Sequence, residues 1–243
     1  MGRFAAIGGG TFEETDGLNR RICDLSGKEK PNILFIGTAA QDSTNPLTSC
    51  KKSFKRVCPG VIVKKLSILR TTYTEEEIDA LISWADVIYV GGGNTAFMLD
   101  EWRRQGIGGK LRRVFEEDSA VLCGMSAGAI CWFTDGYTDS ASFSGDENWE
   151  YEWIRPGIDL FHAAFCPHYD QWERKGFDEE LAKHLDEYEE GALAGIALDD
   201  AAAFIFDNGK LSFERSLNTA NAYAFYKRGD SAEKTAMLPK NIS

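Results

Sequence analysis

The stretch of sequence that is most informative about the fold runs Leu122-Cys123-Gly124-Met125-Ser126-Ala127-Gly128-Ala129-Ile130. An apolar run ends at Gly124, and the apolar residues from Ala129 onward are typical of the beginning of a helix. Ser126 lies at the turn between them, in the pattern Gly-x-Ser-x-Gly. Small neighbours allow the backbone to turn sharply and expose the hydroxyl, as in a nucleophile elbow. The same pattern also fits a tight strand–helix connection with a capping serine, so the pentapeptide alone leaves both interpretations open.

Other apolar runs along the chain also end at glycine. They are Phe4–Ile7 before Gly8-Gly9-Gly10, Asn32–Ile36 before Gly37, and Asp86–Val90 before Gly91-Gly92-Gly93. Continuous apolar runs of this length are typical of strands that are buried on both faces of a parallel sheet. After Gly195, a strand and a return through Asp207-Asn208-Gly209 indicate a C-terminal β-hairpin.

Amphipathic segments separate these runs and predict helices. Thr74 and Glu77 form a capping box, and Asn94 is placed to cap a helix that ends near Gly106. Apolar spacing predicts further helices around 111–115 and over 178–190. Alternating strands and helices predict an α/β fold, with a mostly parallel central sheet and helices on both faces. No repeat or linker interrupts the pattern, so one domain over residues 1–243 is expected.

Composition excludes several classes of function. Among 243 residues, 38 are acidic and 27 are basic, so the formal net charge is −11. This charge argues against nucleic-acid and anionic-membrane partners, which require a positive surface. No apolar run is long enough for a signal peptide or a membrane span, which favours a cytoplasmic protein. The six cysteines form no C-x-x-C or Cys/His pattern, so free thiols and no metal site are expected.

A serine nucleophile needs a base and an orienting carboxylate. Of the three histidines, His168 is the preferred base, because it ends an apolar run where α/β folds build their sites. His162 fits a core position and His184 a surface helix. Asp199 and Asp200 both end the run Gly195–Leu198, and turn residues would explain them equally well. The order Ser, His, Asp along the chain differs from that of the α/β-hydrolases.

Four blocks in order give a more specific indication: Tyr89–Thr95, Gly124–Ala129, Cys166–Tyr169 and Gly195–Asp200. Together they resemble the peptidase E family, which is grouped with the cyanophycinases. The resemblance covers residues 1 to 206 and implies a class I glutamine-amidotransferase-like fold.

The resemblance also implies roles for individual residues. Ser126 would be the nucleophile, His168 its base and Asp200 the orienting carboxylate. The family often has glutamate at the last position, so Asp199 stays an alternative. The backbone N–H of Gly92 or Gly93 would form an oxyanion hole with that of Ala127. Further residues expected to contact substrate are Asn94, Thr95, Asp139 and Tyr169, and no cofactor or metal is implied.

The expected function is a serine peptidase that hydrolyses short peptides, similar to dipeptidase E. The alternatives are a cyanophycinase-like hydrolase and a non-catalytic member that binds a peptide or a partner. Amidotransferase chemistry is disfavoured, because those enzymes use a cysteine where this chain has Ser126. The aromatic and acidic segment 141–157 fits either a wall of the substrate pocket or a surface excursion. Substrate side-chain specificity and oligomeric state, with a homodimer as one alternative, stay open.

Overall fold

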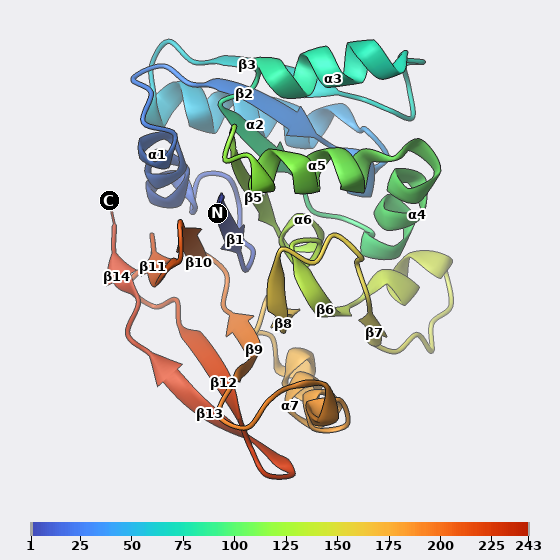
Figure 1. Ribbon diagram of the computed structural model, residues 1–243, viewed down its shortest axis with the longest axis vertical. Coiled ribbons are helices and arrows are strands. Elements are labelled where there is room, and N and C mark those ends of the chain that lie inside the picture. Colours follow the sequence, from blue (N-terminus) through green and yellow to red (C-terminus); the bar gives the residue numbers. More distant parts are fainter. Residues whose placement is uncertain (1, 243) are drawn as a thin grey trace.

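The computed structural model describes residues 2–242 and contains two β-sheets (Figure 1). The larger sheet has eight strands, in the order β14 (Lys240–Asn241), β11 (Lys210–Arg215), β10 (Ala202–Asp207), β1 (Arg3–Ile7), β5 (Val121–Met125), β4 (Val87–Val90), β2 (Asn32–Ile36) and β3 (Ile62–Leu66). From β1 to β3 all neighbours are parallel, whereas β10 is antiparallel to both β1 and β11. The prediction of an α/β fold with a mostly parallel central sheet is therefore confirmed.

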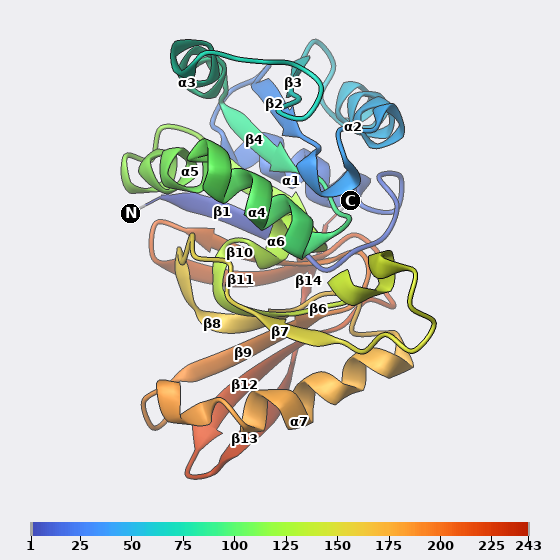
Figure 2. The same ribbon diagram turned by 90° about the vertical axis from the view of Figure 1, so that its right-hand side faces the viewer.

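Helices cover both faces of this sheet, as expected. One face packs against α1 (Asp16–Leu25) and α2 (Thr44–Val57), which contribute Leu18, Ile22 and Phe54 to one apolar cluster. The other face packs against α3 (Glu75–Trp84), α4 (Thr95–Gln105) and α5 (Ile107–Glu116), which contribute to a second cluster. In Figure 2, α3 and α5 lie on one side of β2 and β4, and α2 lies on the other side. Within residues 2–242, no helix is long and apolar enough to cross a membrane.

The predicted capping signals are present. The Thr74 side chain accepts from the N–H of Glu77 at 3.2 Å, and the Glu77 carboxylate accepts from the N–H of Thr74 at 2.8 Å. Asn94 Oδ1 accepts from the N–H of Phe97 at 3.0 Å, and Gly106 ends α4 in the left-handed conformation. These local hydrogen bonds fix where α3 and α4 begin, so the direction of each chain segment leaving β3 and β4 is set locally.

The second sheet was not anticipated. Its six strands have the order β13 (Ser231–Met237), β12 (Ala222–Arg228), β9 (Leu193–Leu198), β8 (Phe161–Cys166), β6 (Phe133–Thr138) and β7 (Glu152–Ile154). It extends below the larger sheet in both views and is covered by α7 (Gly176–Ala182) (Figures 1 and 2). The expected hairpin with its turn at Asp207-Asn208-Gly209 is β10–β11, and β12–β13 is a second antiparallel pair of consecutive strands closer to the C-terminus.

Two helices are shorter than predicted. The helix after Ser126, α6, spans only Ala127–Ile130, because the chain enters β6 at Phe133. The helix expected over 178–190 ends at Ala182, and a 3₁₀ turn, η4 (Leu185–Glu187), follows it. In both places apolar residues were assigned to a helical face, but the second sheet buries them. A helix of one turn has little macrodipole, so only individual N–H groups of α6 are available to a ligand.

Candidate active site

Ser126 occupies a strained turn between β5 and α6. Its backbone has φ 54° and ψ −119°, and its N–H donates to the carbonyl of Ile7 at 3.1 Å. A Cβ at Gly124 would overlap the carbonyl of Gly128, and a Cβ at Gly128 would overlap the carbonyl of Val90. The glycines on either side of Ser126 are therefore required by close backbone packing. This is the geometry that the Gly-x-Ser-x-Gly pattern predicts.

His168 connects the serine to a carboxylate. It follows β8, and its Nε2 lies 2.9 Å from Ser126 Oγ. Its Nδ1 lies 2.6 Å from Asp200 Oδ1. Because an ionised carboxylate only accepts, Nδ1 carries the proton and Nε2 is free to accept from the serine hydroxyl. The structure thus brings Ser126, His168 and Asp200 into one hydrogen-bonded chain that joins the two sheets.

The two adjacent aspartates have different environments. Asp199 is 5% exposed, and its Oδ2 accepts from the backbone N–H of Asn221 at 2.9 Å and from Asn221 Nδ2 at 2.8 Å. Burial raises the pKa of Asp199, although the bonds from Asn221 oppose the shift. Asp200 instead lies beside the imidazole and is about one-third exposed. The structure therefore places Asp200, rather than Asp199, against His168.

The loop after β4 lies directly beside the serine. A Cβ at Gly92 would lie 3.2 Å from Ser126 Cβ and 3.7 Å from Ser126 Oγ. Gly93 has φ 138°, and a Cβ there would overlap the carbonyl of Ala39. Among residues 2–242, no protein acceptor is found for the N–H groups of Gly92, Gly93 and Ala127. Unpaired donors beside a nucleophile are the components of an oxyanion hole.

The other histidines lie elsewhere. His162 contacts Thr134 Oγ1 through Nδ1 at 3.1 Å and packs near Tyr188. His184 stacks on Trp153, with ring centroids 4.4 Å apart, and lies between Glu180 and Glu187. Within the described part of the chain, the structure therefore brings only one imidazole to Ser126.

The cysteines are all buried as free thiols. Cys123, three residues before Ser126, packs into the core beneath the sheet, where burial raises the pKa of its thiol. A buried thiol with a raised pKa is a poor nucleophile. Across residues 2–242, no group of three or more His, Cys, Asp or Glu side chains is arranged to hold a metal ion.

The residues expected to contact substrate are only partly available. Thr95 and Tyr169 are each 1% exposed, so the structure does not present their side chains at the surface. Thr95 accepts from Thr138 Oγ1, and the Tyr169 hydroxyl donates to Asp178 at 2.6 Å. Both side chains are used in packing, which a sequence motif does not distinguish from ligand contact.

Asn94 and Asp139 lie at the edge of the site. Besides capping α4, Asn94 donates through Nδ2 to the carbonyl of Ser140 at 3.4 Å. The 3₁₀ turn η2 (Ser140–Ser144) therefore borders the loop that carries Gly92. Asp139 is partly exposed and pairs with the buried Arg174 at 3.0 Å. The guanidinium also lies over the Tyr151 ring, so this part of the segment 141–157 is packed against the protein.

Gly9 is a site residue that the sequence interpretation missed. A Cβ at Gly9 would overlap Asp200 Oδ1 and the Cε1 and Nδ1 atoms of His168. The available signal was the strand of residues 4–7 that ends in three glycines, the same pattern that had identified the loop at Gly91-Gly92-Gly93. The glycines after residues 4–7 do not by themselves indicate which distant residues pack against them.

The sequence matches a known family of peptidases. The model of peptidase family S51 matches residues 4–213. An uncharacterized peptidase, YgaJ of Bacillus subtilis (strain 168), is 32% identical over 228 residues, which cover 93% of this chain and 91% of that protein.

Two solved structures share the fold. A putative peptidase E protein from Listeria monocytogenes EGD-e has a TM-score of 0.59 at 22% identity, covering 88% of this chain and 98% of its own. A peptidase from an acI-B1 actinobacterium has a TM-score of 0.66 at 19% identity, covering 98% and 97%.

Proposed function

The chain belongs to peptidase family S51, and from this premise we propose that it is a serine peptidase that hydrolyses short peptides through an acyl-enzyme on Ser126. The observation that carries the proposal is the continuous chain from Ser126 Oγ to His168 Nε2 at 2.9 Å, and from His168 Nδ1 to Asp200 at 2.6 Å. A nucleophile, a base and an orienting carboxylate in this order are the elements of acyl transfer.

In the first step, Ser126 Oγ attacks the peptide carbonyl while His168 Nε2 takes the hydroxyl proton. Asp200 keeps the Nδ1 proton in place and stabilises the imidazolium that forms. The imidazolium then donates its Nε2 proton to the leaving amine, and the C–N bond breaks. A water molecule, deprotonated by His168, hydrolyses the resulting ester, which restores the serine and releases the acid.

The negative charge on the tetrahedral intermediate needs donors that are already in place. The N–H of Ala127 follows the nucleophile directly, and the N–H groups of Gly92 and Gly93 lie on the neighbouring loop. Each donor of this kind contributes about 10²–10³-fold in rate in known acyl-transfer enzymes. Glycine at position 92 suits this function, because a side chain there would occupy space beside Ser126 Oγ.

Short substrates are favoured by the surroundings of this loop. The turn η2 borders the loop through the contact between Asn94 and Ser140, and Asp139 contributes a partly exposed carboxylate nearby. A carboxylate at this edge suits the free α-amino group of a short peptide. The resemblance to dipeptidase E favours the same class of substrate.

A serine-directed organophosphonate tests the nucleophile. We expect the purified protein to gain the mass of one phosphonyl group per chain, and the Ser126→Ala variant to gain none. His184→Ala is the matched control and should react like the wild type, because His184 packs on Trp153 away from the site. A dipeptide library with product detection then identifies the substrate. A wild-type protein that forms no adduct and cleaves no peptide would contradict the proposal.

A further inference from the structure

The end of strand β1 is hydrogen-bonded to all three catalytic segments. The carbonyl of Ile7 accepts from the N–H of Ser126 at 3.1 Å, and the carbonyl of Gly8 accepts from the N–H of His168 at 3.2 Å. The carbonyl of Gly9 accepts from the N–H of Ala201, the residue after Asp200, at 3.0 Å. Three consecutive carbonyls, at the last residue of β1 and the two residues that follow it, therefore position the backbone of three segments that are far apart in the sequence.

Each of these donors has an unfavourable backbone conformation. The φ angles of Ser126, His168 and Ala201 are 54°, 54° and 61°. Residues other than glycine adopt left-handed angles at a cost, and keep them only where surrounding contacts enforce them. The bonds to Ile7, Gly8 and Gly9 are contacts of this kind, so β1 contributes directly to the orientation of the reactive side chains.

Gly9 also packs against the reactive side chains themselves. The three atoms nearest to a Cβ at this position would be Asp200 Oδ1, His168 Cε1 and His168 Nδ1, all within overlapping distance. The absence of a side chain at position 9 is therefore what allows the carboxylate and the imidazole to meet. At Gly8, a Cβ would overlap the backbone carbonyls of Leu198 and Asp199, so this glycine fits the end of β9 instead.

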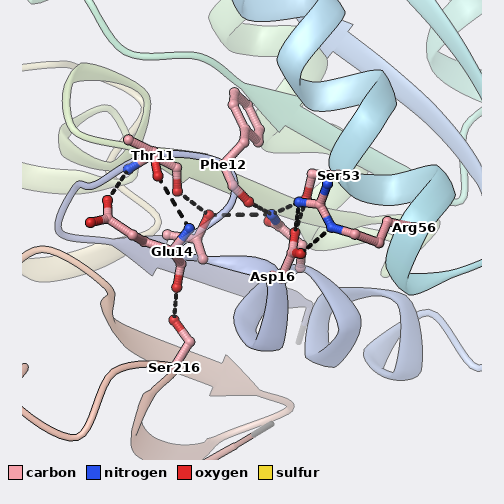
Figure 3. Close-up of polar contacts among 9 residues, drawn as sticks. Thr11, Phe12, Glu14, Asp16, Ser53, Arg56 and Ser216 are labelled. Carbon is pink, nitrogen blue, oxygen red and sulfur yellow. Dashed lines mark hydrogen bonds and ion pairs between the residues drawn. The ribbon is translucent and has the colours of Figure 1, made fainter.

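The loop after Gly9 is fixed at both sides (Figure 3). Thr11 and Glu14 exchange hydrogen bonds, from Thr11 N–H to Glu14 Oε2 at 2.8 Å and from Glu14 N–H to Thr11 Oγ1 at 3.2 Å. The Ser216 hydroxyl donates to the carbonyl of Glu14, which ties the loop to the segment after β11.

On the other side, helix α2 holds the loop through Asp16. The Asp16 carboxylate accepts from Ser53 Oγ at 2.7 Å and from Arg56 Nη2 at 2.8 Å (Figure 3). Asn19 Nδ2 donates to the same Ser53 Oγ at 2.8 Å. A glycine segment anchored in this way cannot move aside freely when a side chain is added to it.

We propose that Ile7-Gly8-Gly9 is the template that assembles the catalytic residues, and that Gly9 is a positioning residue for the His168–Asp200 pair. The inference rests on the proposed function for its link to catalysis. A methyl group at position 9 separates Asp200 Oδ1 from His168 Nδ1, and the imidazole loses both its fixed tautomer and its orientation toward Ser126.

The test compares Gly9→Ala with Gly109→Ala, a matched substitution in α5 where an added Cβ meets no atom within 4 Å. The readout that does not depend on a substrate is the ¹H NMR resonance of the Nδ1–H of His168. A short hydrogen bond to a carboxylate moves this proton far downfield, and the His168→Ala variant assigns it. We expect the resonance in the wild type and in Gly109→Ala, and its loss in Gly9→Ala.

The rate of phosphonylation at Ser126 and kcat/KM for a cleaved peptide should fall about 100-fold or more in Gly9→Ala, since small displacements of reacting groups have effects of this size. An unchanged resonance and rate in Gly9→Ala would overturn the inference, as would a wild type without the resonance. A wild type that shows the resonance but reacts with no phosphonate or peptide would contradict the proposed function and leave the template intact.

A second measurement covers the outcome that Gly9→Ala does not fold. In the His168→Ala/Asp200→Ala background, the three atoms that an alanine at position 9 would meet are absent. Adding Gly9→Ala to this background should therefore give a folded protein with nearly unchanged resistance to urea. Equal destabilisation in both backgrounds would refute the specific contact with the catalytic pair.

Discussion

Replacing Asp200 and Asp199 in turn by alanine should separate catalysis from stability. Asp200 touches the imidazole and is about one-third exposed, whereas Asp199 is buried and bonded to Asn221. We therefore expect Asp200→Ala to lose activity at nearly unchanged stability. We expect Asp199→Ala to lose stability while each folded molecule keeps nearly its full activity.

The size of the first effect follows from the hydrogen bond at 2.6 Å. A hydrogen bond to a charged group contributes about 1.5–3 kcal/mol, which at 1.36 kcal/mol for each tenfold change corresponds to about 10–150-fold in rate. Loss of the fixed tautomer increases the deficit, up to about 10⁴-fold where a triad carboxylate is fully enclosed. Because Asp200 is partly exposed, water replaces some of its effect, and a deficit of about 10²–10³-fold in kcat/KM is expected.

The second effect follows from the two bonds to Asn221. Without Asp199, the two hydrogen bonds to Asn221 are lost, and each contributes about 1 kcal/mol. For a domain of this length, that corresponds to a fall in Tm of about 4–8 °C. Peptide hydrolysis, normalised to the active sites titrated with phosphonate, and thermal unfolding followed by circular dichroism measure the two effects. The reasoning would be refuted if Asp199→Ala lost activity per titrated site while Asp200→Ala kept it.

Three further variants test the strained turn at Ser126, the loop that carries Gly92 and the buried carboxyl group of Asp42. Ser126→Gly should be inactive but about 1 kcal/mol more stable toward urea, because glycine adopts the left-handed backbone conformation at this position without strain. An equal or lower stability would show that the turn is unstrained. Gly92→Ala should lower kcat about 10²-fold, because a Cβ 3.2 Å from Ser126 Cβ displaces the oxyanion donors, whereas an unchanged kcat would exclude this loop from the oxyanion hole. Burial raises the pKa of Asp42, so its stabilising contribution is complete below the unfolded-state pKa and is lost as the pH rises through the raised pKa of the folded state. The side chain of the Asp42→Asn variant cannot ionise, but it keeps an acceptor for the N–H of Leu69 and suits the left-handed backbone. The resistance of this variant to urea, relative to the wild type, should therefore increase between pH 4 and pH 7. A difference that stays constant with pH would contradict the raised pKa.

Local patterns in the sequence were sufficient for much of the larger sheet. Apolar runs that end in glycine identified β1, β2, β4 and β5, and the capping residues Thr74 and Asn94 identified α3 and α4. These features depend on neighbouring residues alone, because strand burial and helix capping are satisfied within a few positions. The turn at Ser126 was predictable for the same reason, since the glycines that permit it are adjacent in sequence.

The second sheet was not predictable from local pattern. The apolar residues from Ala129 to Phe133 were assigned to the beginning of a helix, and no strand was expected over Phe133–Thr138. They form β6 because β7 and β8 pair with them on either side. Pairing of this kind depends on contacts between distant segments, which override the local preference.

The sequence by itself determined that Ser126 stands at a sharp turn, and that a histidine and two aspartates stand at strand ends. Only the tertiary structure decided that Asp200 rather than Asp199 meets His168, and that Gly9 lies beneath them. Adjacent residues at the end of a strand point in different directions. Which of the two aspartate side chains faces the imidazole depends on how β9 pairs with β12 and on how the end of β1 packs against the loop after β9. Those contacts join residues nearly two hundred positions apart, so no local pattern contains them.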